Sequence, residues 1–106
     1  MKPTSIAETE GIMVGVRMVR RRVVFRGQVQ GVGFRYTTQA ISRNHQAVGF
    51  VRNLPDRTVE LVVEGDPAQL NKFQQAIETR MGSNIEGVSV TETQATGEFT
   101  SFDINF

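Results

Sequence analysis

Hydrophobic and polar residues alternate along the early part of this 106-residue chain. Val23, Phe25, Gly27 and Val29 occupy every second position and are separated mainly by polar residues. A two-residue period is typical of a strand with one buried face. Similar alternation over residues 47–53 and 58–64, around a turn-like Leu-Pro-Asp-Arg, predicts two further strands joined as a hairpin.

Two segments have the spacing of amphipathic helices. The first runs from Phe34 to Asn44, with apolar and threonine side chains three and four positions apart. The second begins at Asp66, which is a favourable N-cap before Pro67 and is followed three residues later by Gln69, and it stops at Gly82. Its predicted buried face consists of Leu70, Phe73, Ile77 and Met81.

The order of these elements predicts the fold. Val88 and Val90 indicate a fourth strand, and the aromatic C-terminal residues indicate a short fifth one. We therefore expect an α+β protein, a ferredoxin-like βαββαβ sandwich with two helices packed on one face of an antiparallel four- to five-stranded sheet. A right-handed β-α-β crossover makes the first two strands parallel, so their carboxyl ends meet at one edge of the sheet.

Composition narrows the class of protein further. The net charge is +1, there are no cysteines, and no apolar run approaches the ~20 residues that span a bilayer. We expect a cytoplasmic monomer with no membrane partner. Residues 1–19 lack a sustained period and are predicted to be a flexible N-terminal extension, whereas residues 20–106 form one domain.

A glycine-rich loop follows the first predicted strand. Residues 27–35 read Gly-Gln-Val-Gln-Gly-Val-Gly-Phe-Arg, and the arginine falls where the first helix begins. Glycines allow successive backbone N–H groups to point at one spot, and a helix N-terminus adds further free N–H groups. Arg35 is disfavoured at that end of a helix unless an anion lies beside it. We interpret the loop as a phosphate cradle formed by the backbone N–H groups of Gln30, Gly31, Val32, Gly33 and Phe34, with Arg35 as the cation.

The groups that accompany the cradle restrict the chemistry. Asn53 ends the second strand at the same sheet edge, and the single histidine, His45, lies a helix length away. The sequence has no cluster with metal-ligand spacing, no nucleophile elbow and no Walker-A lysine, so we expect no metal and no cofactor. A mixed carboxylic-phosphoric anhydride suits such a site, because the carboxylate that leaves is already a stable anion near neutral pH. Arg35 and Asn53 are then the candidate catalytic residues, with Asn53 orienting the attacking water.

The glycine loop and residues 49–53, which read Gly-Phe-Val-Arg-Asn, resemble the paired signature of the acylphosphatases. The resemblance extends over about residues 22–106. It implies a small, metal-independent hydrolase of acyl phosphates whose catalytic arginine and asparagine correspond to Arg35 and Asn53. Two departures stand out: Arg57 replaces a hairpin glycine, which predicts a different turn, and His45-Gln46-Ala47 replaces a Leu-Gly-Leu-like helix end, which predicts some loss of stability.

Other interpretations of the sequence are less favoured. RRM domains share the topology, but they stack bases on central-strand aromatics, and residues 58–64 contain none, so we expect no nucleic-acid partner. The basic run at residues 20–22 is read as a solvated start of a strand. A non-catalytic phosphate- or anion-sensing domain is the main alternative. A module of a larger carbamoyl-transfer enzyme is less favoured, because the chain is too short to contain the rest of such an enzyme.

Overall fold

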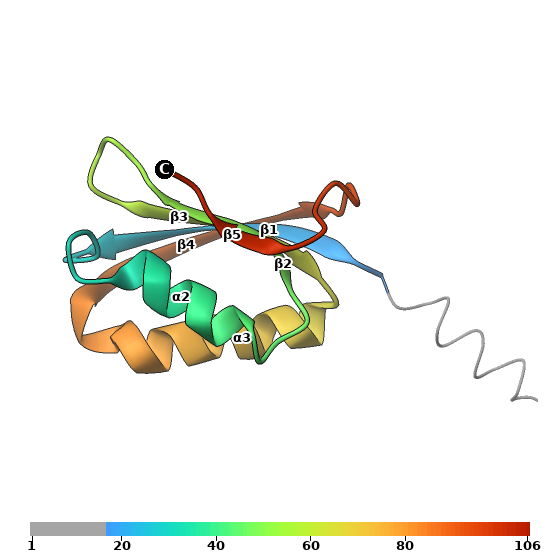
Figure 1. Cartoon of the computed structure of the whole chain (residues 1–106), viewed down its shortest axis with the longest axis horizontal. Coiled ribbons are helices and arrows are strands. Elements are labelled where there is room, and N and C mark those ends of the chain that lie inside the picture. Colours follow the sequence, from blue (N-terminus) through green and yellow to red (C-terminus); the bar gives the residue numbers. More distant parts are fainter. Residues whose placement is uncertain (1–16) are drawn as a thin grey trace, which may run out of the picture.

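The computed structural model describes residues 17–106 and contains the predicted order of elements. Both helices lie beneath a single sheet (Figure 1). The fold is the expected ferredoxin-like α+β sandwich. The elements are β1 (Val19–Gly27), α2 (Phe34–Ser42), β2 (Val48–Asn53), β3 (Val59–Gly65), α3 (Pro67–Met81), a 3-10 turn η1 (Gly82–Asn84), β4 (Ile85–Gln94) and β5 (Phe102–Ile104).

The sheet has the strand order β4-β1-β3-β2-β5. Strands β1 and β2 are each antiparallel to β3, so they run in the same direction, as the crossover rule predicts. Strand β5 differs from the expected antiparallel sheet because it pairs with β2 in parallel, with Gly49 opposite Phe102. The sheet is therefore mixed: four antiparallel strands carry a short parallel strand at one edge.

The core lies between the sheet and the two helices. Val23, Phe25 and Val29 are buried from the β1 side, which confirms the face predicted by their alternation. The helix α3 buries the four apolar residues expected of it, Leu70, Phe73, Ile77 and Met81. These faces together form one continuous hydrophobic cluster that fixes the position of both helices against the sheet.

The ends of α3 are where expected, but they are made differently. The side chain of Asp66 forms no capping hydrogen bond, and this residue acts instead through its backbone carbonyl, which accepts from Leu70 N–H at 3.0 Å. Gly82 has a right-handed backbone (φ −56°) and continues into the 3-10 turn rather than adopting the left-handed cap that glycine often supplies. The prediction that the Asp66 side chain caps the helix is therefore wrong, although the helix begins where the sequence indicates.

Two glutamates on the helix-free face of the sheet are buried by ion pairs. Glu60 accepts from the Nε atoms of Arg22 at 2.5 Å and Arg52 at 2.6 Å. Burial by itself raises the pKa of Glu60, but these two arginines outweigh it and hold that pKa below its ordinary value. The arginines of residues 20–22, read from the sequence as solvated, are therefore paired with acidic side chains.

Glu64 fastens the connection between β4 and β5 across the same face. Its carboxylate accepts from Arg20 Nε at 2.9 Å and from the backbone N–H groups of Thr96 and Gly97 at 2.9 and 3.0 Å. Burial raises the pKa of Glu64, and the hydrogen bonds from Thr96, Gly97 and Arg20 lower it further than burial raises it. The connection is thereby tied down, with Phe99 stacked beneath the Arg20 guanidinium at 5.0 Å.

No helix within residues 17–106 is long and apolar enough to cross a bilayer.

Candidate active site

The glycine loop has the backbone shape needed to turn N–H groups inward. Gly31 and Gly33 have φ angles of 78° and 77°, in the left-handed region, with Val32 between them. A side chain at either glycine would be strained by the backbone, although a Cβ would meet no atom within 4 Å. Alternating backbone conformations of this kind create an anion-binding concavity.

The first turn of α2 continues this concavity. Gly33 is the N-cap, and within the described chain this helix has neither a side-chain capping bond nor an acidic residue in its first turn. Its leading N–H groups therefore have no intrahelical acceptor and remain available to a ligand. Arg35, the second residue of the helix, adds a permanent positive charge beside them.

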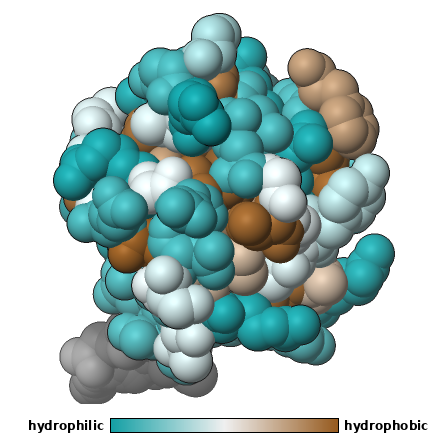
Figure 2. Space-filling view, turned by 90° about the vertical axis from the view of Figure 1, so that its left-hand side faces the viewer, coloured by the Kyte–Doolittle hydropathy of each residue, from teal (hydrophilic) through white to brown (hydrophobic). Residues whose placement is uncertain are grey.

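A cavity of about 100 Å³ joins the loop to the end of β2. It has room for a small tetrahedral anion, since a water molecule occupies about 30 Å³. Figure 2 views the end of the molecule that carries this loop, where small apolar areas lie among hydrophilic side chains. Seven residues line the cavity: Val29, Gly31, Gly33, Phe34, Arg35, Tyr36 and Asn53.

The structure thus brings both candidate catalytic residues, Arg35 and Asn53, to one cavity. Two of the five cradle residues do not line it. Val32 projects outward and is 43% exposed, and Gln30 borders a separate hollow behind the loop together with Arg57. Neither Arg35 nor Asn53 is deeply buried, so a small ligand can reach both.

The C-terminal residue adds a contact that the sequence did not reveal. The Arg35 guanidinium lies over the Phe106 ring, 4.8 Å from its centroid. Parallel pairing of β5 with β2 carries the chain to this point, and Asn105 N–H donates to the carbonyl of Val51 at 2.9 Å. A cation over an aromatic face is attracted by the ring quadrupole, so Phe106 restricts where Arg35 points.

The hairpin after Asn53 keeps the turn that a glycine would allow. Arg57 has φ 76°, so the expectation of a different turn is wrong. The Asp56 carboxylate accepts from both the hydroxyl and the backbone N–H of Thr58, at 2.5 and 3.1 Å. These two bonds lower the pKa of Asp56 and hold the turn, so Arg57 adopts a backbone conformation that L-residues disfavour.

His45 lies away from the cavity. Its ring packs against Phe73 with centroids 5.6 Å apart, and its backbone N–H donates to the carbonyl of Ser42 at the end of α2. His45 thus contributes to the end of the helix and to packing on α3, and it takes no part in the cavity. Among residues 17–106 there is no group of three or more acidic, histidine or cysteine side chains that is placed to hold a metal ion.

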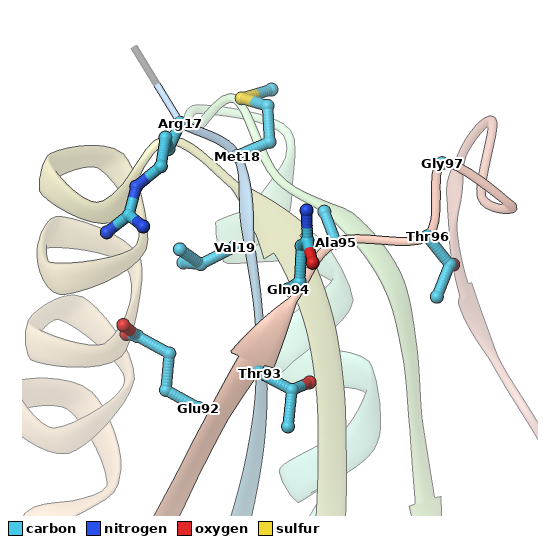
Figure 3. Close-up of a pocket in the computed structure, with 9 residues that line it drawn as sticks. All are labelled: Arg17, Met18, Val19, Glu92, Thr93, Gln94, Ala95, Thr96 and Gly97. Carbon is cyan, nitrogen blue, oxygen red and sulfur yellow. The ribbon is translucent and has the colours of Figure 1, made fainter. Parts of the chain in front are cut away.

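A larger hollow, about 610 Å³, lies at the other end of β1. Figure 3 shows the Arg17 and Glu92 side chains on its α3 side, with Thr96 and Gly97 across from them. The Glu92 carboxylate, on the same side as the Arg17 cation, disfavours binding of a negatively charged phosphoryl group in this hollow. We therefore assign the candidate chemistry to the smaller cavity, where N–H groups, Arg35 and Asn53 converge.

Comparisons with known proteins identify the family to which the chain is related. The sequence model of the acylphosphatase family matches residues 21–104. The acylphosphatase of Bacillus licheniformis is 39% identical over 90 residues, which covers 84% of this chain and all of that protein. The crystal structure of an acylphosphatase from Bacillus subtilis superimposes with a TM-score of 0.74 at 30% identity, over 83% of this chain and 99% of that one. HypF from T. kodakarensis contains the same fold within a much longer chain, with a TM-score of 0.70 at 27% identity over 81% of this chain and 12% of that one.

Proposed function

The chain belongs to the acylphosphatase family and is a hydrolase of small acyl phosphates, and from this premise we propose how its residues divide the reaction. The N–H groups of Gln30, Gly31, Val32, Gly33 and Phe34, together with the Arg35 guanidinium, hold the oxygens of the phosphoryl group. Asn53 orients the attacking water. The observation that supports this division is the shared cavity, which Arg35 lines from the first turn of α2 and Asn53 lines from the end of β2.

Each role follows from the chemistry of its group. The guanidinium fork grips two phosphoryl oxygens and stays charged throughout, so it stabilises the charge that develops as the anhydride bond breaks. The Asn53 carboxamide accepts a hydrogen bond from water through its oxygen and holds the water near the phosphorus. Attack forms the P–O bond as the bond to the acyl oxygen breaks. The carboxylate leaves as a stable anion, and a phosphoryl oxygen takes the proton.

This division needs neither a metal ion nor a cofactor, because the leaving group requires no proton and no Lewis acid. We also propose that residues 20–106 form the working unit, that the protein acts as a cytoplasmic monomer, and that nucleic acids and membranes are not partners. The cysteine-free sequence and the net charge of +1 support these proposals.

Hydrolysis of acetyl and benzoyl phosphate in the presence of EDTA tests the proposal. Arg35→Ala should weaken phosphate inhibition and lower kcat/KM by about 100-fold or more, as losing one stabilising donor does elsewhere. Asn53→Ala should lower kcat while leaving inhibition by phosphate nearly unchanged. Arg43→Ala and Asn44→Ala, which alter exposed side chains at the other end of α2, are matched controls and should behave like the parent protein.

Two outcomes would count against the proposal. Full activity in Asn53→Ala would remove its water-orienting role, and activity that EDTA abolishes would show that a metal takes part. An anion-sensing domain without turnover is not favoured by the family relationship. Phosphate binding with no hydrolysis of any acyl phosphate would restore that alternative.

A further inference from the structure

The side chain of Gln30 joins the two halves of the site. Its Nε2 atom donates to the carbonyl of Leu54 at 2.8 Å and to the carbonyl of Thr58 at 2.9 Å. Leu54 directly follows Asn53, and Thr58 directly precedes β3. One side chain thus connects the phosphate loop to the mouth of the hairpin that carries Asn53.

These bonds use the full donor capacity of the amide. A side-chain NH₂ has two hydrogens, and each is directed to one carbonyl. The same carbonyls also close the hairpin, because Leu54 N–H donates to Thr58 at 2.9 Å and Arg57 N–H donates to Leu54 at 3.1 Å. Gln30 therefore binds a rigid part of the backbone, so its side chain fixes the loop relative to the hairpin and does more than fill space.

The sheet does not make this connection by itself. The loop leaves β1 and Asn53 ends β2, and β3 lies between these two strands. Without Gln30, the cradle and Asn53 are related through two rows of ladder hydrogen bonds, the turn at Arg57 and the packing of α2 against β2. The Gln30 amide reaches over the start of β3 and links the loop to the hairpin directly.

We propose that Gln30 is a positioning residue whose side-chain amide sets the distance between the bound phosphoryl group and the water held by Asn53. This inference rests on the proposed roles of Arg35 and Asn53 and goes beyond the backbone role of Gln30 in the cradle. Because binding uses the loop N–H groups and Arg35, loss of the amide lowers turnover more than it lowers affinity. A misplacement of about 1 Å costs on the order of 100-fold in rate.

Three substitutions at this position separate donor capacity from shape. Gln30→Leu and Gln30→Glu keep the approximate size but remove both N–H donors, and they should lower kcat by about 10- to 100-fold while changing KM and the inhibition constant of phosphate by less than about threefold. Gln30→Lys keeps donors that reach both carbonyls and should retain turnover within about tenfold of the parent. Gln28→Leu alters an exposed glutamine of the same loop and is the matched control.

A double-mutant cycle gives the decisive readout. If Gln30 acts through Asn53, then Gln30→Leu should reduce kcat only slightly when Asn53 is already alanine. Equal losses in both backgrounds, or a loss confined to phosphate affinity, would overturn the positioning role. If Gln30→Leu does not fold, as judged by urea denaturation, the Gln30→Glu and Gln30→Lys pair carries the same test.

The cycle also distinguishes this inference from the proposed function. Failure of the Arg35→Ala and Asn53→Ala tests would reject the division of roles itself. If those two variants lose activity as expected while Gln30→Leu and Gln30→Glu stay fully active, only the Gln30 inference is wrong.

Discussion

Replacing Arg57 with glycine should make the protein more stable. Arg57 lies at the tip of the β2–β3 hairpin with φ 76°, a backbone conformation that glycine adopts without strain and that a residue with a Cβ disfavours. The left-handed region costs an L-residue about 1–2 kcal/mol. Glycine also lowers the free energy of unfolding by about 0.5–1 kcal/mol, because it is more flexible in the unfolded chain.

The net gain in the free energy of unfolding is therefore about 0.75 kcal/mol, the middle of a range of about 0–1.5 kcal/mol. For a domain of this size, 1 kcal/mol corresponds to about 4–8 °C in Tm, so Arg57→Gly should melt roughly 3–6 °C higher. Urea denaturation should show a higher midpoint at an unchanged m-value, because the surface exposed on unfolding stays the same.

Two controls isolate the backbone as the cause. Arg57→Ala removes the same charge but keeps the Cβ, so it should not stabilise the protein. Gly97→Ala makes the opposite change at another position, where φ is 78° and a Cβ would meet no atom within 4 Å, and it should destabilise by about 1 kcal/mol. If Arg57→Ala stabilises as much as Arg57→Gly, the gain comes from the lost side chain and the strain argument is refuted.

Other predictions concern the core, the site and the charged face. Thr38→Val should raise the free energy of unfolding, measured in urea, by about 1 kcal/mol, because the Thr38 hydroxyl is buried without a partner in the described structure and valine has nearly the same shape. A lower free energy of unfolding in Thr38→Val would mean that the hydroxyl is hydrogen-bonded. Phe106→Ala should raise KM and the phosphate inhibition constant about 2- to 5-fold by loosening Arg35, since an exposed cation–π contact contributes about 0.5–1 kcal/mol. Phe106→Tyr keeps an aromatic ring, so equal behaviour of Phe106→Tyr and Phe106→Ala would exclude the ring as the cause. Glu60 and Glu64 have folded pKa values below their unfolded ones, so their contribution to stability should be full above about pH 4.5 and should disappear as the pH falls through the folded values. Urea midpoints from pH 7 to pH 3 measure this loss, and Glu64→Gln should show a shallower decline than the parent protein.

The sequence predicted the fold well where hydrophobic periodicity decides the structure. The alternation over residues 23–29 and the helical face of α3 both depend on which side chains face the core, and a pattern of residue types reveals that directly. The shared sheet edge of the cradle and Asn53 followed from the handedness of one crossover. These features depend on local pattern and general geometry.

Features that depend on specific partners were not predictable in the same way. Glu60 and Glu64 alternate with apolar residues as exposed positions do, but arginines from neighbouring strands cover them. The link from Gln30 to the hairpin joins residues that are 24 and 28 positions apart, and no period in the sequence marks it. Arg57 contradicted a sound rule about turns, because hydrogen bonds at Asp56 and Thr58 hold it in an unfavourable conformation.

The place of β1 in the sheet has a consequence for how the protein is made. This strand comes first among the described elements, yet both of its neighbours come later, β3 from residue 59 and β4 from residue 85. A nascent chain that has emerged only as far as α2 has no strand on which β1 can pair, and closing such distant contacts costs chain entropy before hydrogen bonds repay it. Phosphate binding should therefore be acquired late and in one step, so that recovery of activity during refolding reports completion of the whole sheet.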